Sequence, residues 1–459
     1  MNVNVASPPV LDGLETPRRY WAWTAILLAI ALSVLDSTIA NVALPTMAAE
    51  FGTSPAVTIW VVNGYQLAIV VSLLPLASLG EIVGYRRIHT AGVVIFTLAS
   101  LACTFSGSLP LLIAARVVQG IGAAAMMSVN PALLRYTIPS ARFGSAVGLN
   151  AVVIAAASTL GPTLAGFVLT VASWPWIFAI NVPFGIVAAL IGWFALPESD
   201  RTARRFDVLS ALISAATIAL AILAIDALGH GLPAWLVATE FLALIVIGTL
   251  LVRRELGVAD PLVPLDLLKI PVFSMSVAAS VASFMAQMMA FVSLPFLLQR
   301  TYGYSPHEVG LLMMPWPLAL AVSSPIAGRM SDRLSPAILG GVGLTLFAIG
   351  LAALALLPEA PAAADIAWRM ALCGIGFGMF QSPNNKVLIG ASPRRRSGAA
   401  GGMLATARVM GQTVGTALVG LTLAQFGLAG ATWSLALAAG FAAVAAVVSL
   451  ARFGGLRAM

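Results

Sequence analysis

Acidic side chains inside apolar runs are the residues of this sequence whose type and position could do chemistry. Asp36 lies in the segment L-D-S-T-I-A-N-V-A-L-P (35–45), within an apolar run that begins near Tyr20. At roughly 1.5 Å of rise per helical residue, it lies about 13 Å below the far end of that run. A carboxylate in hydrocarbon is costly, so such an acid usually handles an ion or a substrate. The alternative is a structural acid that a neighbouring cation satisfies.

Arg116 is the cation that could pair with Asp36. It lies about seven residues, roughly 10 Å, below the outer end of its own apolar run, close to the level of Asp36. Burial disfavours the charged form of an acid, and a nearby cation opposes that effect. We therefore expect the two residues to be neighbours, with proton binding at Asp36 altering their pairing. A permanent ion pair that joins two helices is the other interpretation.

Two further charges lie at membrane depth. Glu240 lies about eight residues, roughly 12 Å, into its apolar run, where it could take part in proton coupling, face a cavity or attract a cationic substrate. That run is one of two inserted between repeated halves of the chain, so it need not line a central cavity. Arg408, in the middle of another run, requires an acidic partner or an anionic substrate.

Polar side chains among bulky apolar ones could bind a substrate. The segment S-F-M-A-Q-M-M-A-F (283–291) places Gln287 among Phe284, Met285, Met288 and Phe291. Methionine repacks around differently shaped compounds, although these side chains could equally face lipid or neighbouring helices. Other candidates for polar substrate contacts, each of which could instead bond to another helix, are Asn41, Asn63, Gln66, Gln381, Asn384 and Asn385.

Glycine motifs and charged loops could serve conformational change. G-P-T-L-A-G (161–166) and G-Q-T-V-G (411–415) permit close helix approach and bending, and plain tight packing is an equal alternative. The loop L-G-E-I-V-G-Y-R-R (79–87) and its repeat G-R-M-S-D-R (328–333) place an acid beside arginines, which could latch one state. The residues assigned to this role are Gly161, Pro162, Gly166, Glu81, Gly84, Arg86, Arg87, Gly328, Asp332 and Arg333.

The composition places these residues in a membrane protein. Of 459 residues, 60% are hydrophobic and only 9% are charged, with a mean hydropathy of +0.99. Cys103 and Cys373 lack metal-site spacing and are expected in the core. The sequence has no nucleotide-binding P-loop and no clustered catalytic set. We therefore expect neither an enzyme nor direct ATP drive, and neither a metal nor another cofactor.

The apolar runs predict an all-α membrane fold with fourteen transmembrane helices. The expected ranges are 20–45, 56–79, 87–106, 109–134, 143–170, 175–196, 207–229, 232–252, 271–299, 307–328, 336–357, 363–389, 396–425 and 428–451. Alternate connections carry 20 of the 24 Lys and Arg residues, and of the other four only Arg300 lies in a loop on the opposite side. Cytoplasmic loops collect such charge, so we expect an even number of spans and both termini in the cytoplasm.

An internal repeat divides the chain into two six-helix halves. A shift of 254 residues superposes Pro139, Arg142, Gly144, Gly148, Gly161 and Gly166 on Pro393, Arg396, Gly398, Gly402, Gly415 and Gly420. The expected units are a cytoplasmic segment (1–19), a first bundle (20–196), a linker (197–206), two inserted helices (207–252), a linker (253–270) and a second bundle (271–459). Two related bundles around a central site are typical of transporters.

These segments resemble the major facilitator superfamily, and within it the fourteen-helix drug:proton antiporter branch. Residues 35–45 look like that branch's helix-one signature, and L-I-A-A-R-V-V-Q-G-I-G (112–122) is similar to a helix-four motif whose arginine, here Arg116, is linked to proton coupling. Residues 161–166 resemble the antiporter motif of helix five. W-P-W-I-F-A-I-N-V-P-F-G (174–185) looks like the branch's entry to helix six. The resemblance implies the major facilitator fold and covers nearly the whole chain.

One motif departs from the resemblance. The family's G-x-L-x-D-R-x-G-R-R loop keeps an acid at Glu81 here but loses two basic positions, which puts the usual latch in doubt. The long outer loop of some relatives is absent, so no adaptor partner is expected and a monomer is predicted. The resemblance implies a multi-pass protein of the bacterial inner membrane.

The resemblance also implies a function. It is exchange of protons for lipophilic, cationic compounds such as quaternary ammonium compounds and dyes, by alternating access. Export of an anionic or zwitterionic metabolite is the alternative, because arginines also lie within the apolar runs.

Overall fold

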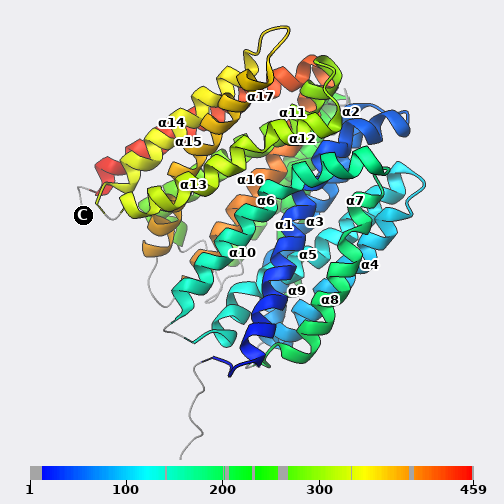
Figure 1. Ribbon diagram of the computed structural model, residues 1–459. Coiled ribbons are helices and arrows are strands. Elements are labelled where there is room, and N and C mark those ends of the chain that lie inside the picture. The colour runs from blue at the N-terminus through cyan, green and yellow to red at the C-terminus, as the bar shows by residue number, and fades with distance from the viewer. Residues whose placement is uncertain are drawn as a thin grey trace, which may run out of the picture.

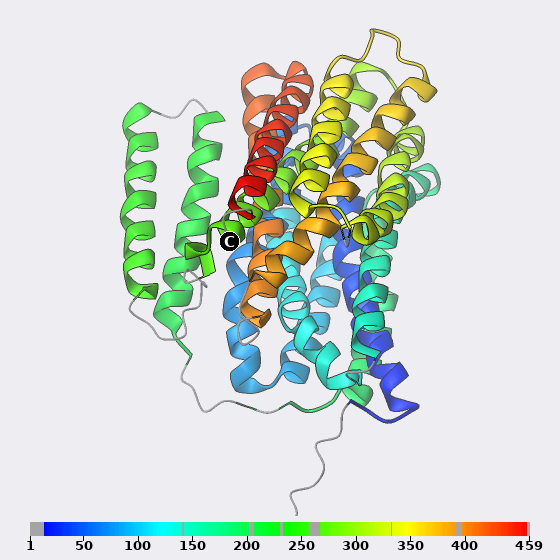
Figure 2. The ribbon, with the colours of Figure 1, turned by 90° about the vertical axis from the view of Figure 1, so that its left-hand side faces the viewer.

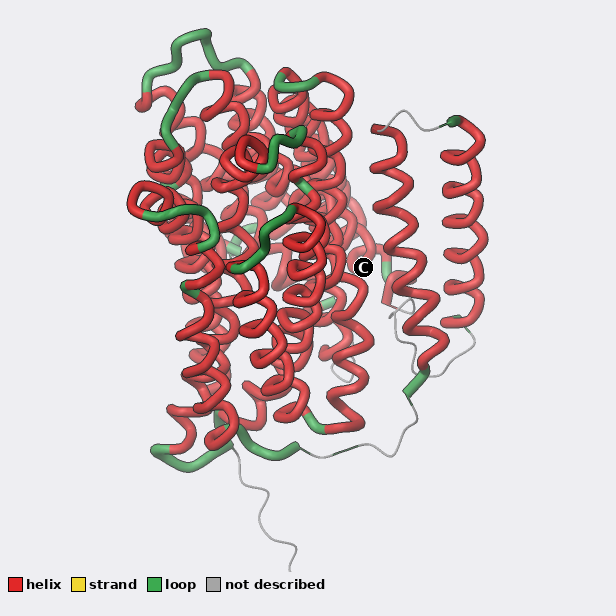
Figure 3. Tube along the Cα trace, turned by 90° about the vertical axis from the view of Figure 1, so that its right-hand side faces the viewer, coloured by secondary structure: helices red, strands yellow, loops and turns green. Residues whose placement is uncertain are grey.

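The computed structural model describes residues 13–139, 142–199, 201, 206–229, 233–256, 267–331, 333–391 and 397–456. That part of the chain consists of helices and the loops between them, as Figure 3 shows. The helices are α1 (Arg18–Glu50), α2 (Pro55–Thr58), α3 (Trp60–Val83), α4 (Tyr85–Thr104), α5 (Leu109–Thr137), α6 (Phe143–Val171), α7 (Trp176–Ala179), α8 (Asn181–Ala195), α9 (Val208–Gly229), α10 (Ala234–Glu255), η2 (Leu267–Lys269), α11 (Pro271–Phe296), η3 (Leu297–Thr301), α12 (Pro306–Met313), α13 (Pro315–Met330), α14 (Pro336–Ala355), α15 (Ala363–Gly390), α16 (Ser397–Phe426) and α17 (Ala429–Leu456).

The helical spans agree with the apolar runs of the sequence. Thirteen helices of the described chain, counting short segments with the helices they continue, are long and apolar enough to cross a membrane. The remaining expected span, 143–170, coincides with α6. Every expected boundary lies within five residues of a helix end. An all-α membrane protein is therefore confirmed, because hydrocarbon tolerates only segments whose backbone groups bond internally.

The two halves repeat each other's helix packing. Figure 1 shows them as two bundles, with α1, α3, α5 and α8 in one and α13, α14, α15 and α17 in the other. Gly120 on α5 lies so close to α3 that an added Cβ would come 2.4 Å from the carbonyl oxygen of Tyr65. Gly374, 254 residues later on α15, lies equally close to α13, where a Cβ would come 2.1 Å from the carbonyl oxygen of Trp316. Both contacts require glycine because backbone meets backbone there.

We expect Gly374→Ala to destabilise the second half by about 1–3 kcal/mol, because the added methyl group would overlap main-chain atoms that cannot move freely. The loss should appear as a lower melting temperature in detergent. Gly440→Ala on α17 is the matched control, since no atom lies within 4 Å of its Cβ position and the melting temperature should not fall. Equal behaviour of the two variants would contradict the close approach of α13 and α15.

Helices α9 and α10 form a peripheral pair. Figure 2 shows this pair beside the two bundles, with α10 on its outer side. Arg254 of α10 donates to both carboxylate oxygens of Asp207, at 3.0 and 3.2 Å. Asp207 also accepts the backbone N–H of Ser210 at 3.0 Å, which caps the start of α9. The Ser210 N–H, assisted by Arg254, keeps the pKa of Asp207 below its usual range.

The described hydrogen bonds between the two halves lie near one end of the molecule. We call the end where α1 begins the basic face and the opposite end the far face. Near the far face, Gln299 donates to the carbonyl oxygen of Val42 at 2.9 Å, and Arg300 donates to that of Pro45 at 2.6 Å. Gly166 of α6 packs on α12, where an added Cβ would come 2.9 Å from the carbonyl oxygen of Pro306. These contacts close the far face between the halves.

Candidate functional site

A buried carboxylate at the centre of the first half forms the candidate site. Asp36 on α1 is completely inaccessible to solvent, as is Arg116 on α5, and the two form an ion pair. The other carboxylate oxygen accepts from Gln119 Nε2 at 3.0 Å and from Asn181 Nδ2 at 2.7 Å. The depth argument is thus confirmed in its geometry, because the expected neighbours are in contact. Asp36 receives three hydrogen bonds, as a buried charge requires.

Arg116 is held by more than the carboxylate. Its Nε donates to the carbonyl oxygen of Val61 at 3.0 Å, and its Nη1 also donates to Gln119 Oε1 at 2.7 Å. The guanidinium lies over the ring of Tyr65, 4.0 Å from its centroid, and 5.3 Å from that of Phe178. Cation–π contacts of this kind are strongest where water is excluded. The guanidinium therefore keeps partners even if Asp36 becomes neutral.

A second layer positions the amide of Gln119. Its Nε2 donates to Ser100 Oγ at 2.8 Å, and Cys103 Sγ donates to its Oε1 at 3.7 Å. Tyr65 Oη donates to the carbonyl oxygen of Ser33 at 3.1 Å, one turn before Asp36. The cluster thus joins α1, α3, α4, α5 and α8. All of these helices belong to the first half, so Asp36 lies inside that half rather than facing the second.

The second half builds the corresponding place from apolar residues. At the offset that relates Gly120 to Gly374, Arg116 and Gln119 correspond to Met370 and Cys373, both buried. The surrounding aromatic rings pack on one another, with centroids 5.4 Å apart for Trp316–Phe347 and for Phe347–Phe377. Arg369, one residue before Met370, pairs with Asp365 on its own helix. The buried cluster of Asp36 and Arg116 therefore has no equivalent in this core. Its cost points to function.

The expected Met/Phe wall lies partly in that aromatic core. Phe284 is 5.3 Å from Phe377 between ring centroids, and Phe291 is 4.9 Å from Trp316. Both rings are therefore buried against helices of the second half, and Met288 is buried as well. Gln287 and Met285 remain partly accessible. The structure therefore does not bring the five residues of this segment together as one exposed wall.

Several predicted polar contacts are buried between helices. Asn384 donates to Ser280 Oγ at 2.8 Å and accepts from Arg452 Nη1 at 2.6 Å, an internal tie of the second half. Asn41, Asn63 and Gln66 are also buried, yet each has at least one side-chain polar atom without a partner in the described chain. They lie on α1 and α3, which contact α11 and α16 of the other half. Unpaired buried amides of this kind need a water or a ligand.

The remaining candidates are dispersed. Gln381 and Asn385 are partly accessible, and Arg408 has no ion pair or hydrogen bond within the described residues. Glu240 lies on α10, the outer helix of the peripheral pair, with its Oε2 buried and unpartnered in the described chain. The structure does not bring Glu240 together with Asp36. Its role in proton coupling stays a prediction.

Some residues of the conformational motifs pack across the two halves, and others stay within one half. Gly161 packs on α1, where an added Cβ would come 2.0 Å from Thr38 Oγ1, and Pro162 and Gly166 meet α12 across the halves. The loop of Glu81, Gly84, Arg86 and Arg87 lies against its own half, with Tyr85 N donating to Ser199 Oγ at 3.0 Å and Arg86 donating to the carbonyl oxygen of Trp193. Gly328 packs on Ser382 of α15, Arg333 follows α13, and Asp332 lies outside the described residues. A latch between the loops stays a prediction.

Comparison with known proteins decides the family. A model of the Major Facilitator Superfamily matches the chain twice, over residues 26–281 and 276–454. The chain belongs to this superfamily. A solved member of the same fold, a bacterial homologue of the human lysosomal transporter Spinster, superposes with a TM-score of 0.68 at 18% identity, covering 95% of this chain and 97% of that one.

Curated relatives in the superfamily include transporters of different substrates. The chain is 50% identical to uncharacterized transporter YebQ of Escherichia coli (strain K12), over 95% of this chain and 96% of that protein. It is 31% identical to riboflavin transporter RibZ of Clostridioides difficile (strain 630), over 87% of each. It is 30% identical to multidrug efflux pump LfrA of Mycolicibacterium smegmatis, over 90% of this chain and 82% of the pump. The protein is thus a multi-pass transporter of small solutes and not an enzyme.

Gln119 and Asn181 were not among the residues expected in the site. Both lie in segments singled out in the sequence, R-V-V-Q-G and I-F-A-I-N. Gln119 follows Arg116 by three residues, the spacing that puts two side chains on one helix face. That signal was sufficient for Gln119. Asn181 opens α8, and only the packing of α8 against α1 shows that its amide reaches Asp36.

Proposed function

We propose that this transporter exports lipophilic, cationic compounds in exchange for protons, as a member of the fourteen-helix drug:proton antiporter branch. The observation that carries the proposal is the buried Asp36, held by a cation and two amides in one half while the corresponding place in the other half is apolar. A titratable acid with no equivalent there is suited to carry a proton. The similarity to multidrug efflux pump LfrA supports a drug substrate.

The proposed cycle couples the proton to the movement of α1. When Asp36 takes up a proton, its ion pair with Arg116 is lost, and Arg116 keeps Val61, Gln119 and the ring of Tyr65. Because Asp36 is fully enclosed here, α1 must shift relative to α5 and α8 to admit the proton. The same helix contacts α11 of the second half, so its shift acts on the seam between the halves.

The proposed orientation places the basic face in the cytoplasm of a bacterium, with the protein in the inner membrane as a monomer without an adaptor. The charge asymmetry of the loops supports this orientation. The contacts of Gln299, Arg300 and Gly166 then close the periplasmic side, which corresponds to an inward-facing state. Asn41, Asn63 and Gln66, whose buried amides lack partners in the described chain, are proposed to meet the substrate near that closure.

Arg408 supports a second candidate, export of an anionic or zwitterionic metabolite. It has no ion pair within the described residues, whereas Arg116 pairs with Asp36 and Arg369 with Asp365 at 3.1 Å. The similarity to riboflavin transporter RibZ shows that relatives do not all carry drugs. An uncompensated cation in a membrane helix attracts an anion.

Transport by everted vesicles distinguishes the two candidates. With a proton gradient imposed, we expect quaternary ammonium compounds and cationic dyes to release protons from the vesicles and to be taken up, with uptake abolished by a protonophore. Vesicles without the transporter are the control. Proton release with anionic compounds and never with cationic ones would reject drug antiport in favour of the second candidate. Uptake that is the same with and without the protonophore would reject proton coupling.

A further inference from the structure

A pocket of about 550 Å³ lies on the basic face of the first half, between the start of α4 and the end of α8. Three arginines line it, namely Arg86, Arg87 and Arg201. We propose that this pocket binds the phosphate headgroup of an anionic phospholipid. The site is separate from the Asp36 cluster, which lies deeper in the same bundle.

The polar end of the pocket is built to receive a phosphate. Helix α4 begins at Tyr85, whose N–H already donates to Ser199 Oγ. The next N–H groups of this first turn, at Arg86 and Arg87, have no acceptor within the helix, and such groups favour anions. Gly84, directly before it, has a φ of +107°, a backbone conformation that favours glycine. A Cβ there would lie 3.6 Å from Arg201 Nε and 3.7 Å from Ser199 Oγ. Arg201 and Ser199 thus lie beside this turn as two potential phosphate partners.

Two of the three arginines in the pocket have no hydrogen-bond or ion-pair partner among the described residues. Arg87 and Arg201 are exposed and make no hydrogen bond or ion pair with the described residues, whereas Arg86 donates to the carbonyl oxygen of Trp193. Thr90 also lines the pocket, and its hydroxyl has no partner in the described chain although the residue is only 9% exposed. Glu198 is the one acid among the lining residues. Three cations against one acid leave the pocket positive.

The apolar end of the pocket favours a lipid over a free phosphate. Below the arginines the lining continues over Val94 and Ile95 of α4 and Trp193 of α8. Val94 is 41% and Trp193 62% exposed, on surfaces of membrane-spanning helices. Tryptophan is enriched at the level of lipid headgroups, and basic pockets between transmembrane helices bind anionic headgroups. A phosphate held by the arginines would place its acyl chains along this apolar wall.

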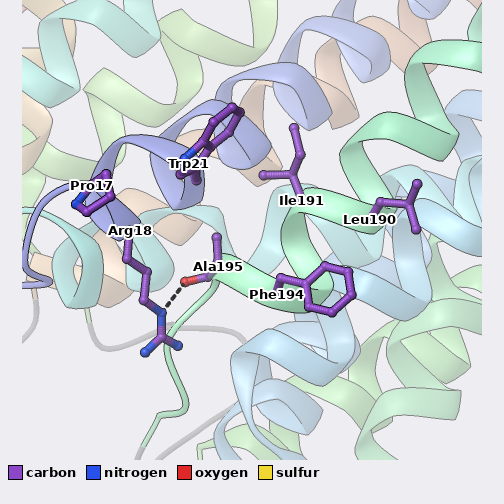
Figure 4. Close-up of a pocket in the computed structure, with 7 residues that line it drawn as sticks. All are labelled: Pro17, Arg18, Trp21, Leu190, Ile191, Phe194 and Ala195. Carbon is purple, nitrogen blue, oxygen red and sulfur yellow. Dashed lines mark hydrogen bonds between the residues drawn. The ribbon is translucent and has the colours of Figure 1, made fainter.

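A second pocket on the other side of α8 shows what such a site requires. Figure 4 shows this pocket, where Arg18 of α1 points to the end of α8 and the other side chains drawn are apolar. Arg18 donates to the carbonyl oxygens of Ala195 at 3.0 Å and Leu196 at 3.2 Å. Its guanidinium is therefore engaged in tying α1 to α8. No other charge lines that pocket, so an anion would meet one engaged guanidinium there and not a cluster of three.

Lipid binding to the purified protein tests the proposal. Phosphatidylglycerol would be titrated into the detergent-solubilised transporter and bound lipid counted by native mass spectrometry. One arginine near the membrane surface is worth about 1 kcal/mol, or roughly fivefold in affinity, so Arg87→Gln/Arg201→Gln should weaken binding about 25-fold. Glu198→Gln should tighten it about fivefold. Arg253→Gln, which removes an exposed arginine of α10 outside the pocket, is the matched control and should change nothing.

Two competitors separate the sources of the phosphate. Phosphatidylcholine, which carries no net charge, should bind weakly and alike to all variants, and inorganic phosphate should not displace phosphatidylglycerol from the wild type. Displacement by inorganic phosphate would overturn the lipid assignment. Unchanged affinity in the double arginine variant, or weaker binding in Glu198→Gln, would overturn the site itself. The opposite signs expected for the two changes exclude a general loss of folding as the explanation.

Discussion

Asp36→Asn is expected to abolish proton-driven export, lowering its rate about 100-fold or more, as the loss of a positioned proton carrier commonly does. Asparagine has nearly the same shape as aspartate and keeps an oxygen that can accept from Gln119 and Asn181. It cannot bind or release a proton. The measurement is dye efflux from cells with and without a protonophore, normalised to the amount of folded transporter.

Exchange of substrate for substrate separates lost coupling from lost structure. This exchange requires binding and alternating access but no net proton movement, so Asp36→Asn should retain it. Substrate affinity of the wild type should rise with pH, because a substrate that displaces a proton competes less as protons become scarce. In Asp36→Asn the affinity should be independent of pH. Protonophore-sensitive efflux at the wild-type rate in this variant would reject Asp36 as the proton carrier.

Asp365→Asn is the matched control for removing an acid from an ion pair. Asp365 pairs with Arg369 on α15, and both side chains are partly accessible, at 27% and 13%. Accessible pairs contribute little to stability, and this pair lies in the other half from the proposed carrier. We expect export to change less than twofold, as for an ordinary surface substitution.

Depth along the membrane was predictable from the sequence, and rotation about the helix axis was not. The fixed rise per residue converts sequence position into depth, which is why Asp36 and Arg116 were expected to meet. Which side of α11 faces the seam depends on its neighbours. Phe284 and Phe291 therefore turned out to pack on Phe377 and Trp316 in the core of the second half.

Ends of spans were the other weak point of the sequence interpretation. Arg452 counted as a loop residue because it follows the last apolar run. In the structure α17 continues to Leu456, and Arg452 is 1% exposed, bound to Asn384 and Ser276. Hydropathy cannot register a buried cation whose partners are neutral amides and hydroxyls on other helices. Asn181 was missed for the same reason, because hydropathy does not distinguish a buried polar residue at the start of a helix from a solvated one.

The free energy that the Asp36–Arg116 ion pair contributes to folding is expected to be about equal to the free energy lost by burying its two charges. Asp36→Asn alone should destabilise the protein by about 3–5 kcal/mol, because Arg116 cannot lose its charge and is left without a counterion. Arg116→Met should cost less, since Asp36 can take up a proton and keep its bonds to Gln119 and Asn181. Methionine is the residue that the second half has at the corresponding position, Met370.

The double variant Asp36→Asn/Arg116→Met should then recover most of this loss, to within about 1–2 kcal/mol of the wild type, because no unpaired charge remains. Unfolding in a mild detergent, measured for the four members of this cycle, gives the coupling energy between the two residues. The double variant should therefore be folded, with nearly the stability of the wild type, and yet inactive in proton-driven export. If its destabilisation instead equalled the sum of the two single changes, the two residues would contribute independently, and an unpaired charge would not explain the cost of Asp36→Asn. A cluster kept for proton transfer requires the opposite result, in which stability returns and transport does not.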